Sequence, residues 1–178
     1  MEINRGDAKI RTITWDCLQE LTTKLVSKIT ADQIRFDVIV AISRGGLIPG
    51  RMVADSLGIR EIQVLGIKYY SNLNQLSQAV LLQRPNSDMT GKRVLIVDDI
   101  SDSGKTLEIA QRELPGTPAV LKSATIFTKP WSTVMPDYFA EITEDWIVFP
   151  WEQNEFRAVL SSVTAVHEQR QRDGGEAN

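Results

Sequence analysis

The chain has 178 residues, a net charge of −3 and 42% hydrophobic residues, a composition typical of one globular domain. This charge gives no positive field that would attract nucleic acid or an anionic membrane, and no apolar run approaches the roughly 18–20 residues of a membrane span. A single cysteine, Cys17, excludes a disulfide framework, and a single histidine, His167, argues against a histidine-rich metal site.

The spacing of apolar residues predicts alternating helices and strands. Short, continuous apolar runs such as Val38–Ile42 and Val94–Val97 are typical of strands that are covered on both faces, as in a parallel sheet. Together they predict an α/β protein with a twisted, mainly parallel sheet flanked by helices. The expected elements are an extra strand within 7–13, a helix from 14 to about 29, a strand over 38–42, a helix over 47–57, and strands over 61–70 and 94–97, then a helix over 107–114 and a strand over 120–127.

Two regions depart from this alternation. Residues 71–88 are polar, and we interpret them as a mobile hairpin, with a short strand over 79–83, that acts as a lid. From Pro136 onward aromatic residues become frequent and the alternation ends, which predicts a small lobe appended to the sheet. We expect residues 1–165 to form a single domain and residues 166–178 to be a frayed polar tail.

The acidic loop after the strand 94–97 carries the first candidate site. Ligands bind at the carboxyl ends of strands in open parallel sheets, and there the chain has Asp98 and Asp99. Ser103-Gly104-Lys105-Thr106 then opens a helix, whose unpaired N–H groups and positive dipole end suit a phosphate. One loop therefore offers acceptors for hydroxyl groups or a metal and donors for a phosphate, as a sugar phosphate requires.

A nucleotide P-loop and a set of helix-capping acids are the two other interpretations of this loop. Gly104-Lys105-Thr106 matches the end of the nucleotide P-loop, but position 99 is Asp where that motif needs Gly, and an acid there would repel a triphosphate. Single carboxylates commonly cap helices without further function. Three carboxylates within five residues, namely Asp98, Asp99 and Asp102, argue for a binding site instead.

The segment Val94–Thr106 closely resembles the phosphoribosyl pyrophosphate (PRPP) motif of type I phosphoribosyltransferases. The resemblance implies the fold of that family, with a small hood lobe over the sheet. It also implies that Asp98 and Asp99 hold the ribose hydroxyls, directly or through Mg²⁺, and that Asp102 lies near purine N7 as the general base. The residues implied to bind PRPP are Asp98, Asp99, Asp102, Ser103, Gly104, Lys105 and Thr106.

A second phosphate loop follows the first buried strand. Ser43-Arg44-Gly45-Gly46 combines a permanent cation with two glycines that free the backbone, and a helix is expected directly after it. An ordinary turn would account for the glycines but not for Arg44. The segment resembles the pyrophosphate loop of xanthine-guanine phosphoribosyltransferase, which implies that Ser43, Arg44 and Gly45 bind pyrophosphate; in that family the loop often has a cis peptide.

The segments Phe127-Thr128-Lys129-Pro130 and Trp146–Glu152 resemble the hood of xanthine-guanine and hypoxanthine-type enzymes, which would extend over about residues 128–156. The resemblance implies that Lys129 binds the 6-oxo group of a purine, that Trp146 stacks on its ring and that the backbone near Ile147 contacts the other edge. It places Glu152 with Asp98 and Asp99 as a metal-binding residue, although some relatives have Asp there. Without the resemblance, packing of Trp146 and solvation of Lys129 would be the simpler interpretation.

The resemblance implies transfer of the phosphoribosyl group of PRPP to N9 of guanine, xanthine or hypoxanthine, with Mg²⁺, in purine salvage. The alternatives are a PRPP-sensing regulatory protein that binds RNA, which should have a basic patch, and an enzyme for another base, although Lys129 would repel the amino group of adenine. We expect a cytoplasmic protein, because residues 1–7 lack an apolar signal core. The family resemblance implies a homo-oligomer, either a dimer or a tetramer. We expect no nucleic-acid partner and no integral membrane segment.

Overall fold

The computed structural model describes residues 9–72 and 75–158, and the side chains of these residues outside 69–78. The described chain divides into two compact units. The larger unit consists of residues 19–144, and the smaller unit combines the residues before 19 with those after 144. The predicted tail at 166–178 lies outside the described residues.

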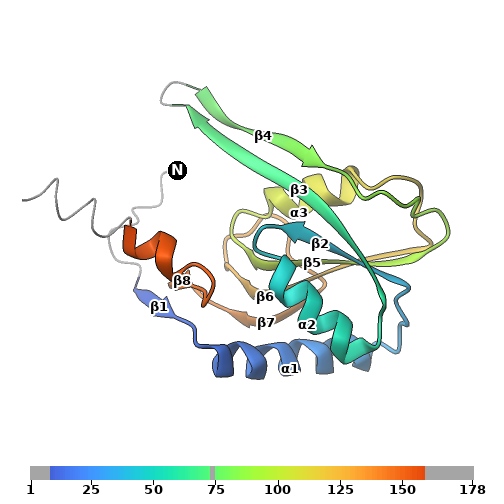
Figure 1. Cartoon of the computed structure of the whole chain (residues 1–178), viewed down its shortest axis with the longest axis horizontal. Coiled ribbons are helices and arrows are strands. Elements are labelled where there is room, and N and C mark those ends of the chain that lie inside the picture. The colour runs from blue at the N-terminus through green and yellow to red at the C-terminus, as the bar shows by residue number, and fades with distance from the viewer. Residues whose placement is uncertain (1–8, 73–74, 159–178) are drawn as a thin grey trace, which may run out of the picture. The chain divides into compact units, whose positions relative to one another are not determined.

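A six-stranded sheet forms the larger unit, with the strand order β4-β3-β2-β5-β6-β7 (Figure 1). All neighbouring strands are parallel except β3 and β4, which are antiparallel. This arrangement confirms the predicted α/β class. The elements are α1 (Trp15–Ala31), β2 (Val38–Ser43), α2 (Leu47–Leu57), β3 (Glu61–Asn72), β4 (Gln75–Gln83), β5 (Arg93–Ser101), α3 (Lys105–Arg112), β6 (Val120–Thr128) and β7 (Tyr138–Ile142).

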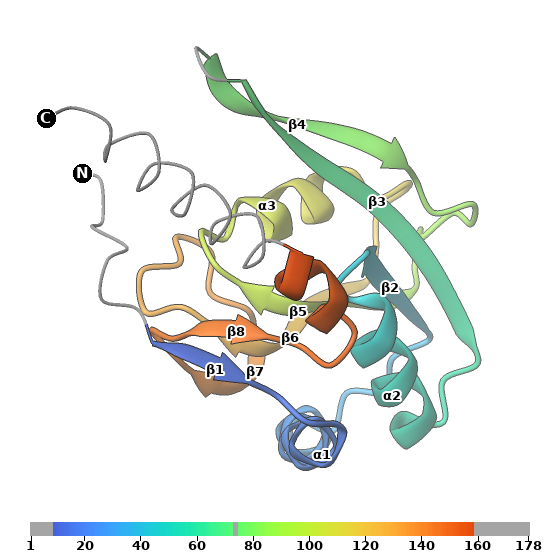
Figure 2. The same cartoon turned by 60° about the vertical axis from the view of Figure 1, so that its left-hand side comes forward.

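Helices cover both faces of the sheet, because alternate residues of the central strands point to opposite sides. On one face, Val40 and Ile96 pack in a buried cluster with Leu107 and Ala110 of α3. On the other face, Gly50 of α2 lies so close to Ala41 that a Cβ at position 50 would be 3.0 Å from the Ala41 Cβ. Helices α2 and α3 therefore lie on opposite faces (Figure 2).

Strand β5 is longer than the apolar run 94–97 that predicted it, and it continues through the acidic pair to Ser101. Strand β2 pairs with it only as far as Val97. On the other side, β6 continues the pairing, with Ile100 opposite Phe127 and Ser101 opposite Thr128. The expectation of a loop directly after Val97 is therefore wrong, because the pairing with β6 keeps this segment extended.

The polar excursion predicted over 71–88 lies largely in an antiparallel hairpin formed by β3 and β4 (Figure 1). Both strands are longer than expected, since β3 continues to Asn72 and β4 begins at Gln75 rather than at residue 79. Residues 73 and 74 lie outside the described residues. The lid action of the hairpin stays a prediction.

The aromatic region after residue 136 is divided between the two units. Strand β7 pairs in parallel with β6 and so extends the main sheet, whereas a separate lobe was predicted there. Its alternating pattern explains this position, because Tyr138 and Ala140 are buried, and the Tyr138 hydroxyl donates a hydrogen bond to Asp32 at 2.7 Å.

The smaller unit contains a two-stranded parallel sheet of β1 (Ile10–Thr12) and β8 (Trp146–Val148). Strand β1 confirms the extra strand expected within 7–13. The rings of Phe149 and Trp151 stack with centroids 4.7 Å apart. Across both units, the described helices are all too short or too polar to span a membrane.

Candidate functional site

The order of the strands identifies where a ligand should bind. After β2 the chain passes to β3 on one side, and it later returns to β5 on the other side of β2. The carboxyl ends of β2 and β5 therefore flank a switch point of the sheet, the usual ligand position in open α/β proteins. The two predicted phosphate loops, 43–46 and 102–106, directly follow these two strands.

Asp98 and Asp99 are buried near the end of β5, with 7% and 8% of their surface exposed. Backbone N–H groups bind both carboxylates, since Asp99 N donates to Asp98 Oδ1 at 3.0 Å and Ile100 N donates to Asp99 Oδ1 at 2.7 Å. Burial, reinforced by the neighbouring Asp99 charge, raises the pKa of Asp98 well above its usual range. Two adjacent carboxyl groups are thus buried together, where a bound cation or hydroxyl donors would stabilise their charged forms.

The predicted phosphate turn forms the start of α3. Gly104 precedes the helix with a φ of 82°, a left-handed conformation that favours glycine. A Cβ at this position would also overlap the backbone nitrogen of Val134. Helix α3 begins at Lys105, directly after Ser103 and Gly104, so the turn predicted to bind a phosphate lies at a helix N-terminus, and its binding role stays a prediction.

Residues 131–134, which we call the strap, attach this turn to the segment after β6. The Ser103 carbonyl accepts hydrogen bonds from Thr133 N at 3.1 Å and from Thr133 Oγ1 at 2.7 Å. The hydroxyl groups of Ser101 and Ser132 are 2.9 Å apart and form a further hydrogen bond. The strap thus holds the backbone on both sides of Asp102.

The second loop packs directly against the acidic pair. The peptide bond between Ser43 and Arg44 is cis. A Cβ at Gly45 would overlap the Asp99 carboxylate, and a Cβ at Gly46 would overlap the Val97 carbonyl oxygen. A side chain at position 46 would therefore require the backbone to move, and one at position 45 would displace the Asp99 carboxylate, so the loop 43–46 lies directly beside the acidic pair.

Lys129 follows β6 and is 6% exposed. Its backbone N–H donates to the Ser101 carbonyl at 2.9 Å, which places it beside the end of β5. Its Nζ lies over the ring of Trp131, 5.4 Å from the centroid. Trp131 in turn donates from Nε1 to Asp102 Oδ1 at 3.1 Å.

Trp131 is not among the residues that the sequence predicts for the site, yet it contacts two of them, Asp102 and Lys129. No pattern in the sequence indicates this contact, because residues 102 and 131 meet only through the pairing of β5 with β6. One indirect signal exists: Trp131 directly follows the Lys129-Pro130 that closes the predicted strand.

The remaining predicted residues belong to the smaller unit. Trp146, at the start of β8, is 51% exposed, whereas Ile147 is buried and pairs with Arg11 of β1. Glu152 accepts a hydrogen bond from Phe149 N at 3.2 Å, so it stabilises the local turn. The meeting of Lys129 and Trp146 at a base, and of Glu152 with the acidic pair at a metal, stays a prediction because these residues lie in different units.

Asp98 and Asp99 supply part of a donor set for Mg²⁺. Within the described residues, no group of three or more acidic, histidine or cysteine side chains could hold a metal by itself. The adjacent carboxylates of Asp98 and Asp99 nevertheless fit the usual magnesium site, in which one or two carboxylates are completed by substrate phosphates and water.

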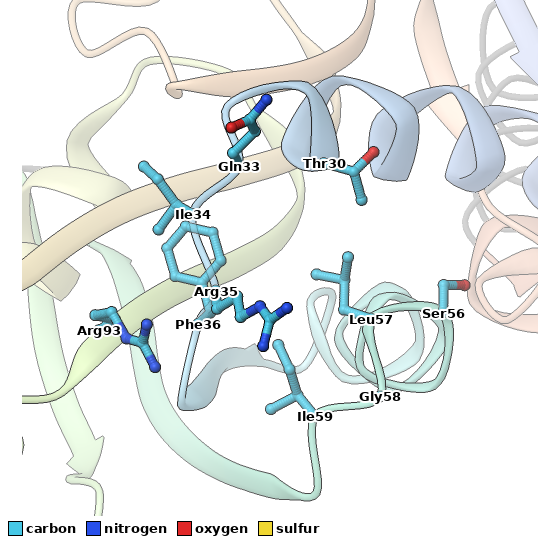
Figure 3. Close-up of a pocket in the computed structure, with 10 residues that line it drawn as sticks. All are labelled: Thr30, Gln33, Ile34, Arg35, Phe36, Ser56, Leu57, Gly58, Ile59 and Arg93. Carbon is cyan, nitrogen blue, oxygen red and sulfur yellow. The ribbon is translucent and has the colours of Figure 1, made fainter.

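A cavity of about 800 Å³ lies at the opposite edge of the same sheet (Figure 3). It is lined by the segment after α1, the end of α2 and Arg93 at the start of β5, and Arg35 points toward Ile59 within it. None of the predicted site residues lines this cavity. Its position at the amino ends of the strands separates it from the switch point.

A parallel sheet with two glycine-containing turns and an acidic pair at its switch point is typical of α/β proteins that bind phosphorylated substrates. The family model for the phosphoribosyl transferase domain matches residues 14–154. The chain therefore belongs to the phosphoribosyltransferase family and is an enzyme of that family, as the resemblance of residues 94–106 predicted.

Solved structures agree with this assignment. A purine phosphoribosyltransferase from Pyrococcus horikoshii is 35% identical, with a TM-score of 0.70, and the match covers 80% of this chain and 93% of that one. A hypothetical protein from Neisseria gonorrhoeae with bound ppGpp is 25% identical, with a TM-score of 0.72 and coverages of 82% and 90%. Xanthine-guanine-hypoxanthine phosphoribosyltransferase of Helicobacter pylori is 21% identical, with a TM-score of 0.70 and coverages of 85% and 99%, and so shares the fold.

Proposed function

We propose that this enzyme transfers the 5-phosphoribosyl group of PRPP to N9 of a 6-oxopurine, giving the nucleoside monophosphate and pyrophosphate. The observation that carries the proposal is the packing of the loop 43–46 against the buried acidic pair, with Gly45 beside Asp99, while the turn at Ser103 begins two residues after the same strand β5 ends. One site thus offers two anion-binding turns with hydroxyl acceptors between them, which matches the two ends of PRPP.

In this proposal the acidic pair and the turn before α3 bind the sugar phosphate. Asp98 and Asp99 accept hydrogen bonds from the ribose hydroxyls, and the backbone N–H groups of Ser103–Thr106 bind the 5′-phosphate. Lys105, Thr106 and Ser103 add cationic and hydroxyl donors. Burial of the acidic pair makes each of these hydrogen bonds stronger than it would be in water.

The second loop binds the leaving group. As the bond from ribose C1′ to pyrophosphate breaks, negative charge develops on the pyrophosphate oxygens. The Arg44 guanidinium and the N–H groups around Ser43 and Gly45 stabilise that charge in place, and such preorganised stabilisation is usually the largest catalytic contribution. Mg²⁺, when bound by Asp98 and Asp99, supplies further positive charge to the phosphate oxygens.

In this proposal three residues recognise the base, as the family resemblance implies. Lys129 donates to the 6-oxo group, Trp146 stacks on the ring, and the backbone near Ile147 contacts the opposite edge. Asp102 accepts the proton from N7 as N9 attacks the sugar. The exposed Trp146 ring and the nearly buried Lys129 ammonium suit these roles, because one offers a flat face and the other a fixed donor.

The role of Asp102 is tested by Asp102→Asn. A positioned general base contributes about 10²–10⁴-fold to the rate, so we expect kcat to fall by at least about 10² while PRPP binding is retained. Steady-state kinetics and calorimetric titration with PRPP would measure the two effects. Near-normal turnover in this variant would exclude Asp102 as the base.

The substrate is tested by an ultraviolet assay of nucleotide formation from PRPP and Mg²⁺ with guanine, xanthine, hypoxanthine, adenine and orotate in parallel. We expect turnover with at least one of the three 6-oxopurines and none with adenine or orotate. Activity with adenine or orotate alone would contradict the proposed base pocket. PRPP binding without turnover of any base would favour the alternative, a PRPP-sensing protein of the same fold.

A further inference from the structure

Asp102 has one side-chain partner among the residues that the structure describes. Its Oδ1 accepts a hydrogen bond from Trp131 Nε1 at 3.1 Å. The tryptophan belongs to the strap, 29 positions further along the chain, so the contact comes from the tertiary fold rather than from a local turn. An indole N–H only donates, and it therefore holds the carboxylate in one orientation and competes for one oxygen only.

The face of the same ring contacts Lys129. The ammonium lies over the ring at 5.4 Å from its centroid, within the range of a cation–π interaction. The indole therefore binds an anion at its edge and a cation at its face. In a purine, N7 and the 6-oxo group lie on the same edge. An acid that accepts the N7 proton and a cation that binds the 6-oxo group must therefore lie close together without forming an ion pair with each other.

The strap keeps this ring in place. Ser132 and Thr133, the two residues after Trp131, are hydrogen-bonded to Ser101 and Ser103 on both sides of Asp102. The backbone of Val134 contacts Gly104 so closely that no side chain fits between them. Trp131 itself is 38% exposed, so its position is set by these bonds more than by burial.

We propose that Trp131 is a positioning residue for base transfer, which orients the Asp102 carboxylate toward N7 through its N–H and keeps Lys129 aligned with the 6-oxo group through its ring face. The proposal rests on the proposed function and adds to it a residue that acts through two others. It predicts that the two contacts of the ring have separable kinetic effects.

Two substitutions separate the contacts. Trp131→Phe removes the N–H donor and keeps an aromatic face for Lys129, whereas Trp131→Leu removes both. We expect Trp131→Phe to lower kcat about tenfold with the KM for PRPP and for the purine unchanged, because only the orientation of the base is lost. We expect Trp131→Leu to show the same fall in kcat and, in addition, a purine KM raised about fivefold.

A double-mutant cycle tests whether the effect passes through Asp102. In the Asp102→Asn background, Trp131→Phe should lower kcat by less than about twofold further, since the group that it positions is already inactive. Trp15→Phe makes the same chemical change at another exposed tryptophan and should leave kcat and both KM values unaltered. Thermal unfolding of each variant checks that it is folded.

The hydrogen bond has a readout that does not depend on turnover. The indole N–H resonance of Trp131, assigned by its loss in Trp131→Phe, should shift in Asp102→Asn, whereas the other indole resonances stay in place. If the wild-type enzyme is active, three results would each overturn this proposal alone. They are an unchanged kcat in Trp131→Phe, a further fall in kcat in the double variant, and an indole resonance of Trp131 that does not move in Asp102→Asn. A wild-type enzyme that transfers to no base would overturn the proposed function together with it.

Discussion

Asp98 lies where the folded protein disfavours a negative charge. The side chain is buried beside Asp99, and burial together with the neighbouring charge raises its pKa. A group whose pKa is raised by folding is protonated more easily in the folded state. The shifted pKa of Asp98 therefore stabilises the folded state fully at pH values below the pKa of this group in the unfolded chain. This stabilisation is lost as the pH rises through the pKa of the group in the folded protein.

Replacing Asp98 by Asn should consequently stabilise the ligand-free protein at neutral pH. We expect the melting temperature of Asp98→Asn to exceed that of the wild type by about 2–4 °C per kcal/mol of relieved repulsion at pH 7.5. The difference should shrink toward pH 4, because the raised pKa favours protonation of the wild-type carboxyl as the pH falls. PRPP binding should be lost in the same variant, because the amide removes an acceptor for the ribose hydroxyls. Calorimetric melts at the two pH values, followed by PRPP titration, measure both effects.

Asp37 supplies a control with the opposite sign. Hydrogen bonds from Arg93 lower the pKa of Asp37 to about 2, so this group stabilises the folded state above its unfolded pKa of 3.8 and loses that effect as the pH falls toward 2. Asp37→Asn should therefore melt below the wild type at pH 7.5, with PRPP binding intact. A lower melting temperature for Asp98→Asn at pH 7.5 would contradict the account of the acidic pair.

At the level of single residues, the acids and glycines of the two loops could be predicted from the sequence, because their chemistry is concentrated in short segments. The role of Trp131 could not, since its partners Asp102 and Lys129 are brought to it by strand pairing. The local contact of Glu152 could not be predicted either. Its carboxylate accepts a hydrogen bond from Phe149 N, and a resemblance based on residue type does not reveal such a contact.

At the level of elements, the loop 43–46 packs against the end of β5, and this packing requires a residue without a side chain at position 45. We expect Gly45→Ala to displace the Asp99 carboxylate, which a Cβ there would overlap, and to raise the KM for PRPP at least about tenfold. Gly58→Ala is the matched control, since its Cβ would meet nothing within 4 Å although its φ is 68°. It should cost about 1–2 kcal/mol of stability, because a left-handed φ is strained for alanine, and leave the KM unchanged. Equal KM values for the two variants would show that the loops do not depend on each other.

The β3–β4 hairpin can be shortened without disturbing its register. Replacing 71–77 by Asn-Gly, a favoured two-residue turn, joins Tyr70 to Gln78, which are already paired. If the hairpin excludes water from the reacting sugar, the ratio of PRPP hydrolysis to transfer should rise in this variant. Leu82→Ser, at an exposed position of β4, serves as the control. An unchanged ratio would refute the lid.

The types and order of the elements in the larger unit were predictable because apolar runs and glycine-containing turns alternate along the chain. The first and last residues of these elements were less predictable. Strand β5 extends through polar residues because β6 pairs with it there, and β7 joins the main sheet because Tyr138 and Ala140 fit its buried face. Such pairings depend on distant segments and leave no local pattern.

For the molecule as a whole, the proposed active site lies at the carboxyl edge of the sheet and not at the amino edge. Arg44 lies at the carboxyl edge, and Arg35 lies in the cavity at the amino edge. We expect Arg44→Ala to lower kcat by about 10²-fold or more, as for other losses of preorganised charge stabilisation, whereas Arg35→Ala keeps wild-type kinetics. A loss of activity in Arg35→Ala alone would move the functional site to the opposite edge. The expected dimer or tetramer stays a prediction.

The most direct test of the central claim is a crystal structure of the protein soaked with ribose 5-phosphate and Mg²⁺. The account predicts that the phosphate lies on the backbone N–H groups of Ser103–Thr106 and that the ribose hydroxyls face Asp98 and Asp99. Ligand density in the cavity beside Arg35, or none at the turn before α3 under saturating conditions, would contradict it.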